Sequence, residues 1–153
     1  MRKTLIVLAA LLACGVARAA NPDPGLTVEQ ALNISAALRA LDTYEAKDKD
    51  GKSYAAPYTF SGVTRMAIAV DLEKTSAVLK IYQATVNEVI RQLSGGGAKV
   101  PPERMAEFNT ETTKMLAAPA GISLTRIKQA DLKLDENPIP GSVLGLLLPI
   151  IDR

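Results

Sequence analysis

Residues 62–93 form an unbroken run of about thirty residues that contains no proline and no glycine after Gly62. Proline and glycine are the residues that most disfavour a helix interior, so the run predicts one long helix. Apolar positions recur at alternating steps of four and three residues, the spacing of a seam that faces a partner helix. The seam consists of Ile68, Leu72, Thr75, Leu79, Tyr82, Val86, Val89 and Leu93. At roughly 48 Å such a helix exceeds the core of a small domain, and we expect it to be the central rod of a helical bundle.

A second apolar line runs beside this seam and widens the arc that the pattern assigns to burial. It consists of Val63, Met66, Val70, Ala77, Val78, Ile81 and Ile90. A wide apolar arc is typical of a helix that other elements cover on more than one side. The sequence therefore predicts neighbours on at least two sides of the rod.

Three further helices are predicted around the rod. The first, about Val28 to Leu41, begins with a capping box at Thr27 and Gln30. The second, about Pro102 to Ala117, follows the glycines at 95–97, and the third begins at about Ser142 and is strongly apolar. Aromatic residues make up only 4% of the chain while its apolar share is 48%, which favours helices packed on helices. We expect a mainly α fold, a small bundle formed by residues 27–153 as a single domain.

Residues 43–61 break the helical period and place a turn signal, Asp50-Gly51, between aromatic residues. This pattern predicts a β-hairpin attached to the bundle. The aromatic residues are Tyr44, Tyr54, Tyr58 and Phe60. They hold the hairpin against the helices or, alternatively, line an interaction surface. The turn is not a calcium loop, because the first and last ligand positions fall on Ala46 and Pro57.

Residues 122–134 allow two interpretations. Alternating apolar positions predict a strand that pairs with the hairpin to make a three-stranded sheet, whereas Leu124 to Leu134 also fits a helix. The overlapping segment from Asp131 to Pro140 looks like a sequence motif, but its residues suggest no mechanism. The apolar residues from Val143 to Ile151 are too few to cross a membrane. We expect them to close the core or, alternatively, to form an apolar surface that binds a partner.

The first nineteen residues have the pattern of a signal peptide. Arg2 and Lys3 precede an apolar run, and Ala17-Arg18-Ala19 forms a small-x-small cleavage site. Residues 20–26 would then be a proline-containing linker. An alternative is acylation at Cys14, which follows Leu-Leu-Ala as in a lipobox and would anchor the chain to a membrane. We expect an exported protein, periplasmic or secreted in the first case and a membrane-anchored lipoprotein in the second.

Composition excludes several classes of chemistry. Histidine is absent and Cys14 is the only cysteine, so a chain cleaved after Ala19 has no imidazole and no thiol. Such a chain has no His-based triad, disulfide, or His- or Cys-ligated metal, and we expect no cofactor and no enzymatic activity. Its net charge is −1, from 15 basic and 16 acidic residues, so we expect no nucleic-acid binding.

One acidic row offers an alternative to a purely structural role. Glu103, Glu107 and Glu111 recur every four residues on one face of the predicted 102–117 helix. Carboxylates in this arrangement could bind a divalent cation or act as an acid–base pair. Arg104 and Lys114 lie close to them, however, and a solvated acidic face near a helix N-terminus is the commoner arrangement.

Two functional hypotheses follow. The first is a non-catalytic exported protein that binds another protein, or a second copy of itself through its helix seam, or that stabilises a cell-envelope assembly. The second is a carboxylate-dependent enzyme or metal binder that uses the acidic row. A membrane would be a partner only if Cys14 is acylated.

Overall fold

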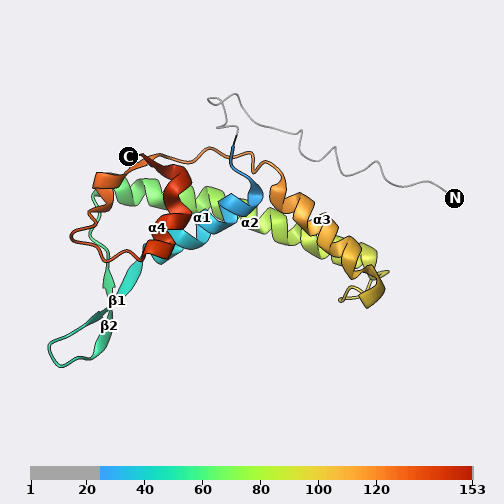
Figure 1. The fold of residues 1–153 in the computed structure, drawn as a ribbon, viewed down its shortest axis with the longest axis horizontal. Coiled ribbons are helices and arrows are strands. Elements are labelled where there is room, and N and C mark those ends of the chain that lie inside the picture. The colour runs from blue at the N-terminus through green and yellow to red at the C-terminus, as the bar shows by residue number, and fades with distance from the viewer. Residues whose placement is uncertain (1–24, 153) are drawn as a thin grey trace.

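The computed structural model describes residues 25–152, and Figure 1 shows a mainly helical chain built on one long helix, α2. Helix α2 spans Gly62–Leu93, as the sequence predicts, and begins with the Ser61 hydroxyl accepting from the Thr64 amide. The predicted leader, the lipobox cysteine Cys14 and most of the linker lie outside the described residues.

Helix α1 spans Val28–Ala40 and packs against α2. Its predicted capping box is confirmed, since the Gln30 amide donates to Thr27 Oγ1 (3.2 Å) and the Thr27 amide donates to Gln30 Oε1 (2.9 Å). Helix α1 buries five residues, Ala31, Ile34, Ser35, Ala37 and Leu38. It is therefore the main partner of α2 in the core.

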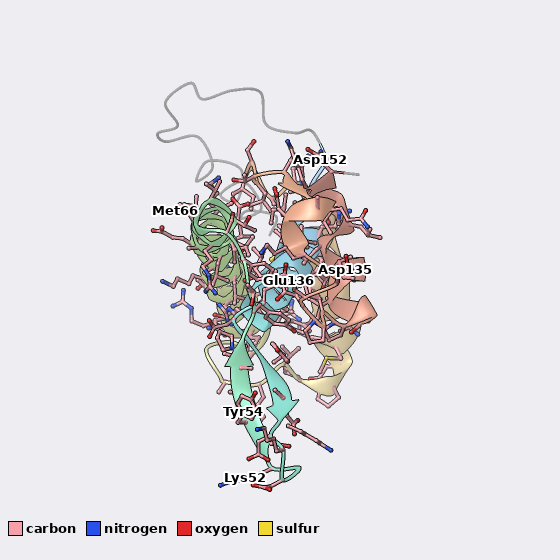
Figure 2. The ribbon with its side chains drawn as sticks, turned by 90° about the vertical axis from the view of Figure 1, so that its left-hand side faces the viewer. Lys52, Tyr54, Met66, Asp135, Glu136 and Asp152 are labelled. Carbon is pink, nitrogen blue, oxygen red and sulfur yellow. The ribbon has the colours of Figure 1, made fainter. Side chains whose placement is uncertain are left out.

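The β-hairpin is confirmed and projects away from the helices, as Figures 1 and 2 show. Strand β1 (Thr43–Lys47) pairs antiparallel with β2 (Ser53–Pro57). Gly51 takes a positive φ of 77° in the turn, a backbone conformation that glycine adopts without strain. The Asp48 carboxylate accepts from the amides of Asp50 and Lys52, so its role in the structure is to shape the turn.

Helix α3 spans Met105–Ala117 and follows a short 3₁₀ turn, Pro102–Arg104, in agreement with the predicted 102–117 helix. It lies alongside the C-terminal half of α2 (Figure 1). The Arg104 guanidinium donates to the Leu93 carbonyl (3.2 Å), which joins the start of this helical segment to the end of α2.

The segment after α3 differs from both interpretations of residues 122–134. Only Ile127–Lys128 (β3) is a strand, and it pairs in parallel with Ile151–Asp152 (β4) near the C-terminus. The predicted three-stranded sheet is wrong, because β3 joins β4 and the hairpin remains a separate two-stranded sheet. The helical interpretation is also wrong except for one 3₁₀ turn, Gln129–Leu132.

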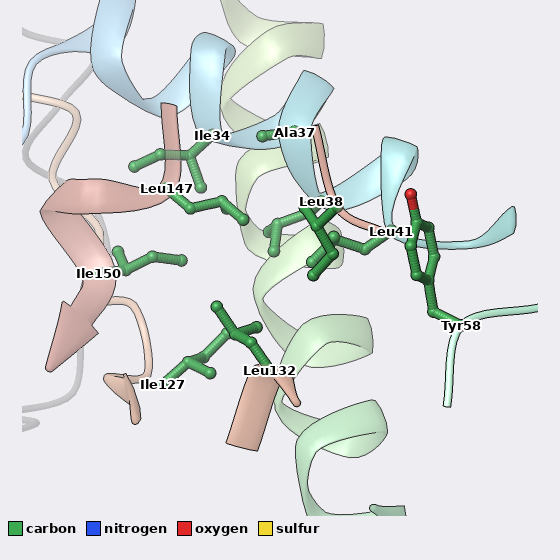
Figure 3. Close-up of a cluster of buried hydrophobic side chains, with 10 residues drawn as sticks. Ile34, Ala37, Leu38, Leu41, Tyr58, Ile127, Leu132, Leu147 and Ile150 are labelled. Atoms are coloured by element: carbon green, nitrogen blue, oxygen red, sulfur yellow. The ribbon is translucent and has the colours of Figure 1, made fainter. Parts of the chain in front are cut away.

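The C-terminal apolar residues close the core, as predicted. Helix α4 (Gly141–Leu147) and the 3₁₀ turn Leu148–Ile150 bring Leu147 and Ile150 against α1. Figure 3 shows the resulting cluster of buried side chains. It comprises Ile34, Ala37, Leu38, Leu41, Tyr58, Ile127, Leu132, Ile139, Leu147 and Ile150. One end of α2 therefore lies beside a compact body formed by α1, α4 and the segment between α3 and α4.

Candidate interaction surfaces

Helix α2 contacts α1 and α3, but its second apolar line lies largely in solvent. Within that line Val78 is buried and Ile90 half-buried, so the predicted burial of the line is wrong for most of its residues. Val63 is 84% exposed, Met66 66%, Val70 40% and Ile81 66%. We call these four residues the outer row. Figure 2 shows Met66 on the outer side of α2, away from the C-terminal segment.

Polar side chains occupy several inward positions of α2, beside Ile68 and Leu72, which pack against the core. Thr64, Asp71 and Thr75 are buried, and Asp71 and Thr75 are fully inaccessible. The Thr75 hydroxyl donates to the Asp71 carbonyl (2.9 Å) within the helix, which satisfies it without a tertiary partner. Apolar side chains are left on the solvent side of the same helix, a distribution typical of a surface that binds something else.

Asp71 fastens the segment after α3 to the long helix. Its Oδ2 accepts from the Thr125 amide (2.7 Å), and its Oδ1 accepts from the Thr125 hydroxyl (3.2 Å) and from Lys74 Nζ (3.3 Å). Lys74 Nζ also donates to the Ser123 carbonyl (2.9 Å). Two adjacent side chains of α2 thereby hold residues 123–125 in place.

Asn137 gives the segment from Asp131 to Pro140 a structural explanation. The buried Asn137 accepts from the Thr59 amide through Oδ1 (2.7 Å) and donates through Nδ2 to the carbonyls of Thr59 (3.1 Å) and Leu132 (2.8 Å). The side-chain amide of Asn137 thus pairs with both backbone groups of Thr59, as the backbone of a neighbouring strand would. The segment therefore joins the base of the hairpin to the C-terminal part of the chain.

The aromatic residues divide into two groups. The rings of Tyr44 and Tyr58 lie 4.9 Å apart, and those of Tyr58 and Phe60 lie 5.8 Å apart, where the hairpin meets the helices. Tyr58 is only 2% exposed, and its burial, with a smaller contribution from Tyr44, raises the pKa of its phenol. These three rings hold the hairpin on the body.

Tyr54 stands apart from this stack. It is 53% exposed and lies on the hairpin away from the helices, as Figure 2 shows. It borders an open hollow of about 310 Å³ that only hairpin residues line, Thr43, Tyr44, Glu45, Ser53, Tyr54 and Ala55. Of the four predicted aromatic interaction residues, Tyr54 is the most accessible.

The acidic row lies on α3 and the turn before it. Arg104 Nη2 and Glu107 Oε2 are 2.8 Å apart, and Lys114 Nζ and Glu111 Oε1 are 2.9 Å apart. Between residues 25 and 152, no group of three acidic side chains is arranged to hold a metal ion. Two of the three carboxylates are thus engaged by a neighbouring cation on their own helical segment.

The last candidate surface is the arm, which we define as residues 79–93 of α2 together with α3. Helices α1 and α3 have thirteen residues each, yet α1 buries five of them and α3 buries none. In the α2 part of the arm only Leu93 is buried. The N-terminal end of α1 contacts the end of α3, where the Val28 amide donates to the Ala118 carbonyl (2.9 Å). Along the longest axis of the molecule the rest of the arm extends beyond α1 (Figure 1), so α2 and α3 share the apolar seam there.

We define the arm seam as six half-buried apolar side chains of these two helices. They are Leu79, Tyr82, Val86, Val89, Phe108 and Met115. These positions continue the four-three spacing of the predicted rod and of the 102–117 helix. A two-helix layer cannot enclose such a seam, which in helical bundles a further layer covers.

No family model, no curated protein and no solved structure matches this chain. Among the helices of residues 25–152, none combines the length and the apolar character needed to cross a membrane.

Proposed function

We propose that this chain is an exported, non-catalytic helical protein that binds another protein of its compartment through the outer row of α2. The observation that carries the proposal is the exposure of Val63, Met66, Val70 and Ile81 on one side of the long helix. Val63, Met66 and Val70 lie on successive turns of α2. Ile81 lies eleven residues after Val70, and Lys74, which binds the Ser123 carbonyl, stands between them. From Val63 to Ile81 the row spans about 27 Å. Large exposed apolar side chains in a row are typical of protein-binding surfaces.

Composition supports the non-catalytic part of this proposal. The chain has no histidine, and the chain that begins at Ala20 has no cysteine. The carboxylates of the acidic row would have to provide any acid–base chemistry, and Glu107 and Glu111 each form an ion pair with a cation on the same helical segment. Recognition through apolar contacts needs none of these groups.

Substitution of Met66 by lysine tests the outer row. We expect the variant to lose the protein that cross-linking and affinity capture retain from the host's cell envelope, because a charge on this face must be desolvated on binding. The free energy of unfolding of this variant should change by less than about 0.5 kcal/mol, since the Met66 side chain is exposed. Gln83→Lys adds the same charge at another exposed position of α2 and should retain the partner. Equal retention by both variants, or no retained partner with the native chain, would contradict the proposal.

We also propose that the first nineteen residues direct export and are removed. Intact-mass measurement of the protein from its host tests this, because the possible products differ widely in mass. We expect a chain that begins at Ala20. A chain that begins at an acylated Cys14 would instead make the protein a membrane-anchored lipoprotein, and a chain that retains residues 1–19 would contradict export by this route.

A further inference from the structure

We propose that the arm is a self-association surface: the arm seam of one copy packs against the arm seam of a second copy, and the two helical hairpins form a four-helix bundle. This surface is separate from the outer row and does not depend on what the outer row binds. Val89 and Phe108 belong to the seam between α2 and α3, whereas Ile81 lies in solvent on the other side of α2.

The first argument is incomplete burial. An apolar seam that faces a single partner helix stays partly open to water, and covering it is favourable by about 25 cal/mol for each Å² of apolar surface. In the body, α4 packs on α1, and α1 packs on α2. In the arm, α3 buries none of its residues, and its seam residues Phe108 and Met115 are only half-buried. A second two-helix layer would supply the cover that the arm lacks.

The second argument is size. The two helical parts of the arm are about 20 Å long, and two adjacent helices are about 20 Å wide. A face of this size would bury on the order of 400 Å² on each copy, about 800 Å² in total, which is below the roughly 1,000 Å² of stable specific interfaces and in the range of weak, transient ones. The arm can thus support a dimer, but one that dissociates on dilution, in the micromolar range.

The third argument is charge, because a second copy brings the same charges to the interface. Arg91 and Glu88 form an ion pair at 2.8 Å, and ion pairs also hold Glu107 and Glu111. The two remaining charged residues of the arm and its preceding turn, Lys80 and Glu103, have opposite signs, so the arm is neutral overall. A neutral surface does not repel its own copy, and low net charge favours association.

Sedimentation velocity of the chain from residue 20 to 153, at about 1 to 300 µM, tests the proposal. We expect a monomer–dimer equilibrium. Val89→Glu and Met105→Glu should each raise the dissociation constant at least about tenfold, because the first places a charge in the arm seam and the second places one a single helical turn from Phe108. Met105→Glu is the milder change, since Met105 is 42% exposed and a carboxylate is favourable in the first turn of a helix. Ile81→Glu is the matched control and should leave the constant unchanged, because it alters the outer row.

Circular dichroism of each variant reports whether the arm remains helical. The oligomeric state of the native chain tests the proposal without any substitution. A native chain that stays monomeric up to 300 µM overturns the proposal, and so does a monomer whose arm cross-links to a different protein. A dimer that Ile81→Glu dissociates, while Val89→Glu and Met105→Glu leave it intact, also overturns it. Failure of the Met66→Lys experiment concerns only the outer row.

Discussion

Replacement of Asn137 by alanine is expected to lower the free energy of unfolding by about 3 kcal/mol, and the melting temperature by about 10 °C. The buried side chain makes three hydrogen bonds, two with the backbone of Thr59 and one with the Leu132 carbonyl. Alanine removes all three of these hydrogen bonds, and the loss of each costs about 1 kcal/mol. Thermal or urea unfolding followed by circular dichroism measures the change.

Two companion variants identify the cause of this loss. Asn109→Ala removes the same side chain from an exposed position of α3 and should change stability by less than about 0.5 kcal/mol. Asn137→Asp keeps the size and the acceptor but replaces the amide donor, so we expect a loss comparable to that of alanine because a charge is also buried. A loss below about 1 kcal/mol for Asn137→Ala would show that Asn137 does not join the hairpin to the C-terminal part of the chain.

The helices could be predicted from the sequence because their signals are local. Thr27 and Gln30 lie three residues apart and report directly on the start of α1. The glycines after Leu93 and the prolines before α3 mark helix ends in the same way. The Asp50-Gly51 signal predicts the hairpin because the turn itself requires a residue with positive φ.

The path of residues 118–140 could not be predicted, because contacts between residues distant in sequence determine it. The Asp71–Thr125 hydrogen bonds join residues 54 apart, and the Asn137–Thr59 bonds join residues 78 apart. Nothing in the local pattern of Ile127 and Lys128 indicates a parallel pairing with two residues near the C-terminus. The interpretation as a third strand of the hairpin relied on alternation alone and missed these constraints.

The candidate surfaces were predictable only in part. The apolar lines of α2 are visible in the sequence, and Thr75 of the predicted seam is buried as expected. The burial of Asp71 is not visible, because a hydrophobic pattern assigns a carboxylate to the surface. The sequence predicts one aromatic group at the hairpin, Tyr44, Tyr54, Tyr58 and Phe60. The structure separates Tyr54 from the other three rings, which lie close together. The arm seam stays half-buried because no further layer from residues 25–152 covers it, and the pattern of a single helix does not reveal which neighbours it has.

Replacement of Asp71 by alanine is expected to lower the free energy of unfolding by about 3 kcal/mol. The fully buried carboxylate accepts from the Thr125 amide and hydroxyl and from Lys74. The loss should fall at the lower end of the range for broken buried ion pairs, because the side chain of Lys74 is 39% exposed and keeps its hydrogen bond to the Ser123 carbonyl. Urea unfolding measures the total, and hydrogen exchange at the Thr125 amide reports the local change.

Comparison with Asp71→Asn separates charge from hydrogen bonding at this site. Asparagine keeps an oxygen that can accept from the Thr125 amide and loses the attraction to Lys74, so we expect a cost of about 1 to 2 kcal/mol, less than that of alanine. Glu73→Ala removes an exposed carboxylate two residues away and should cost less than about 0.5 kcal/mol. If Asp71→Ala and Glu73→Ala had equal effects, the burial of a carboxylate in α2 would not be what holds residues 123–125. The segment after α3 would then owe its position to the β3–β4 pairing and to Asn137, and the Thr125 amide would exchange equally fast in the native chain and in both variants.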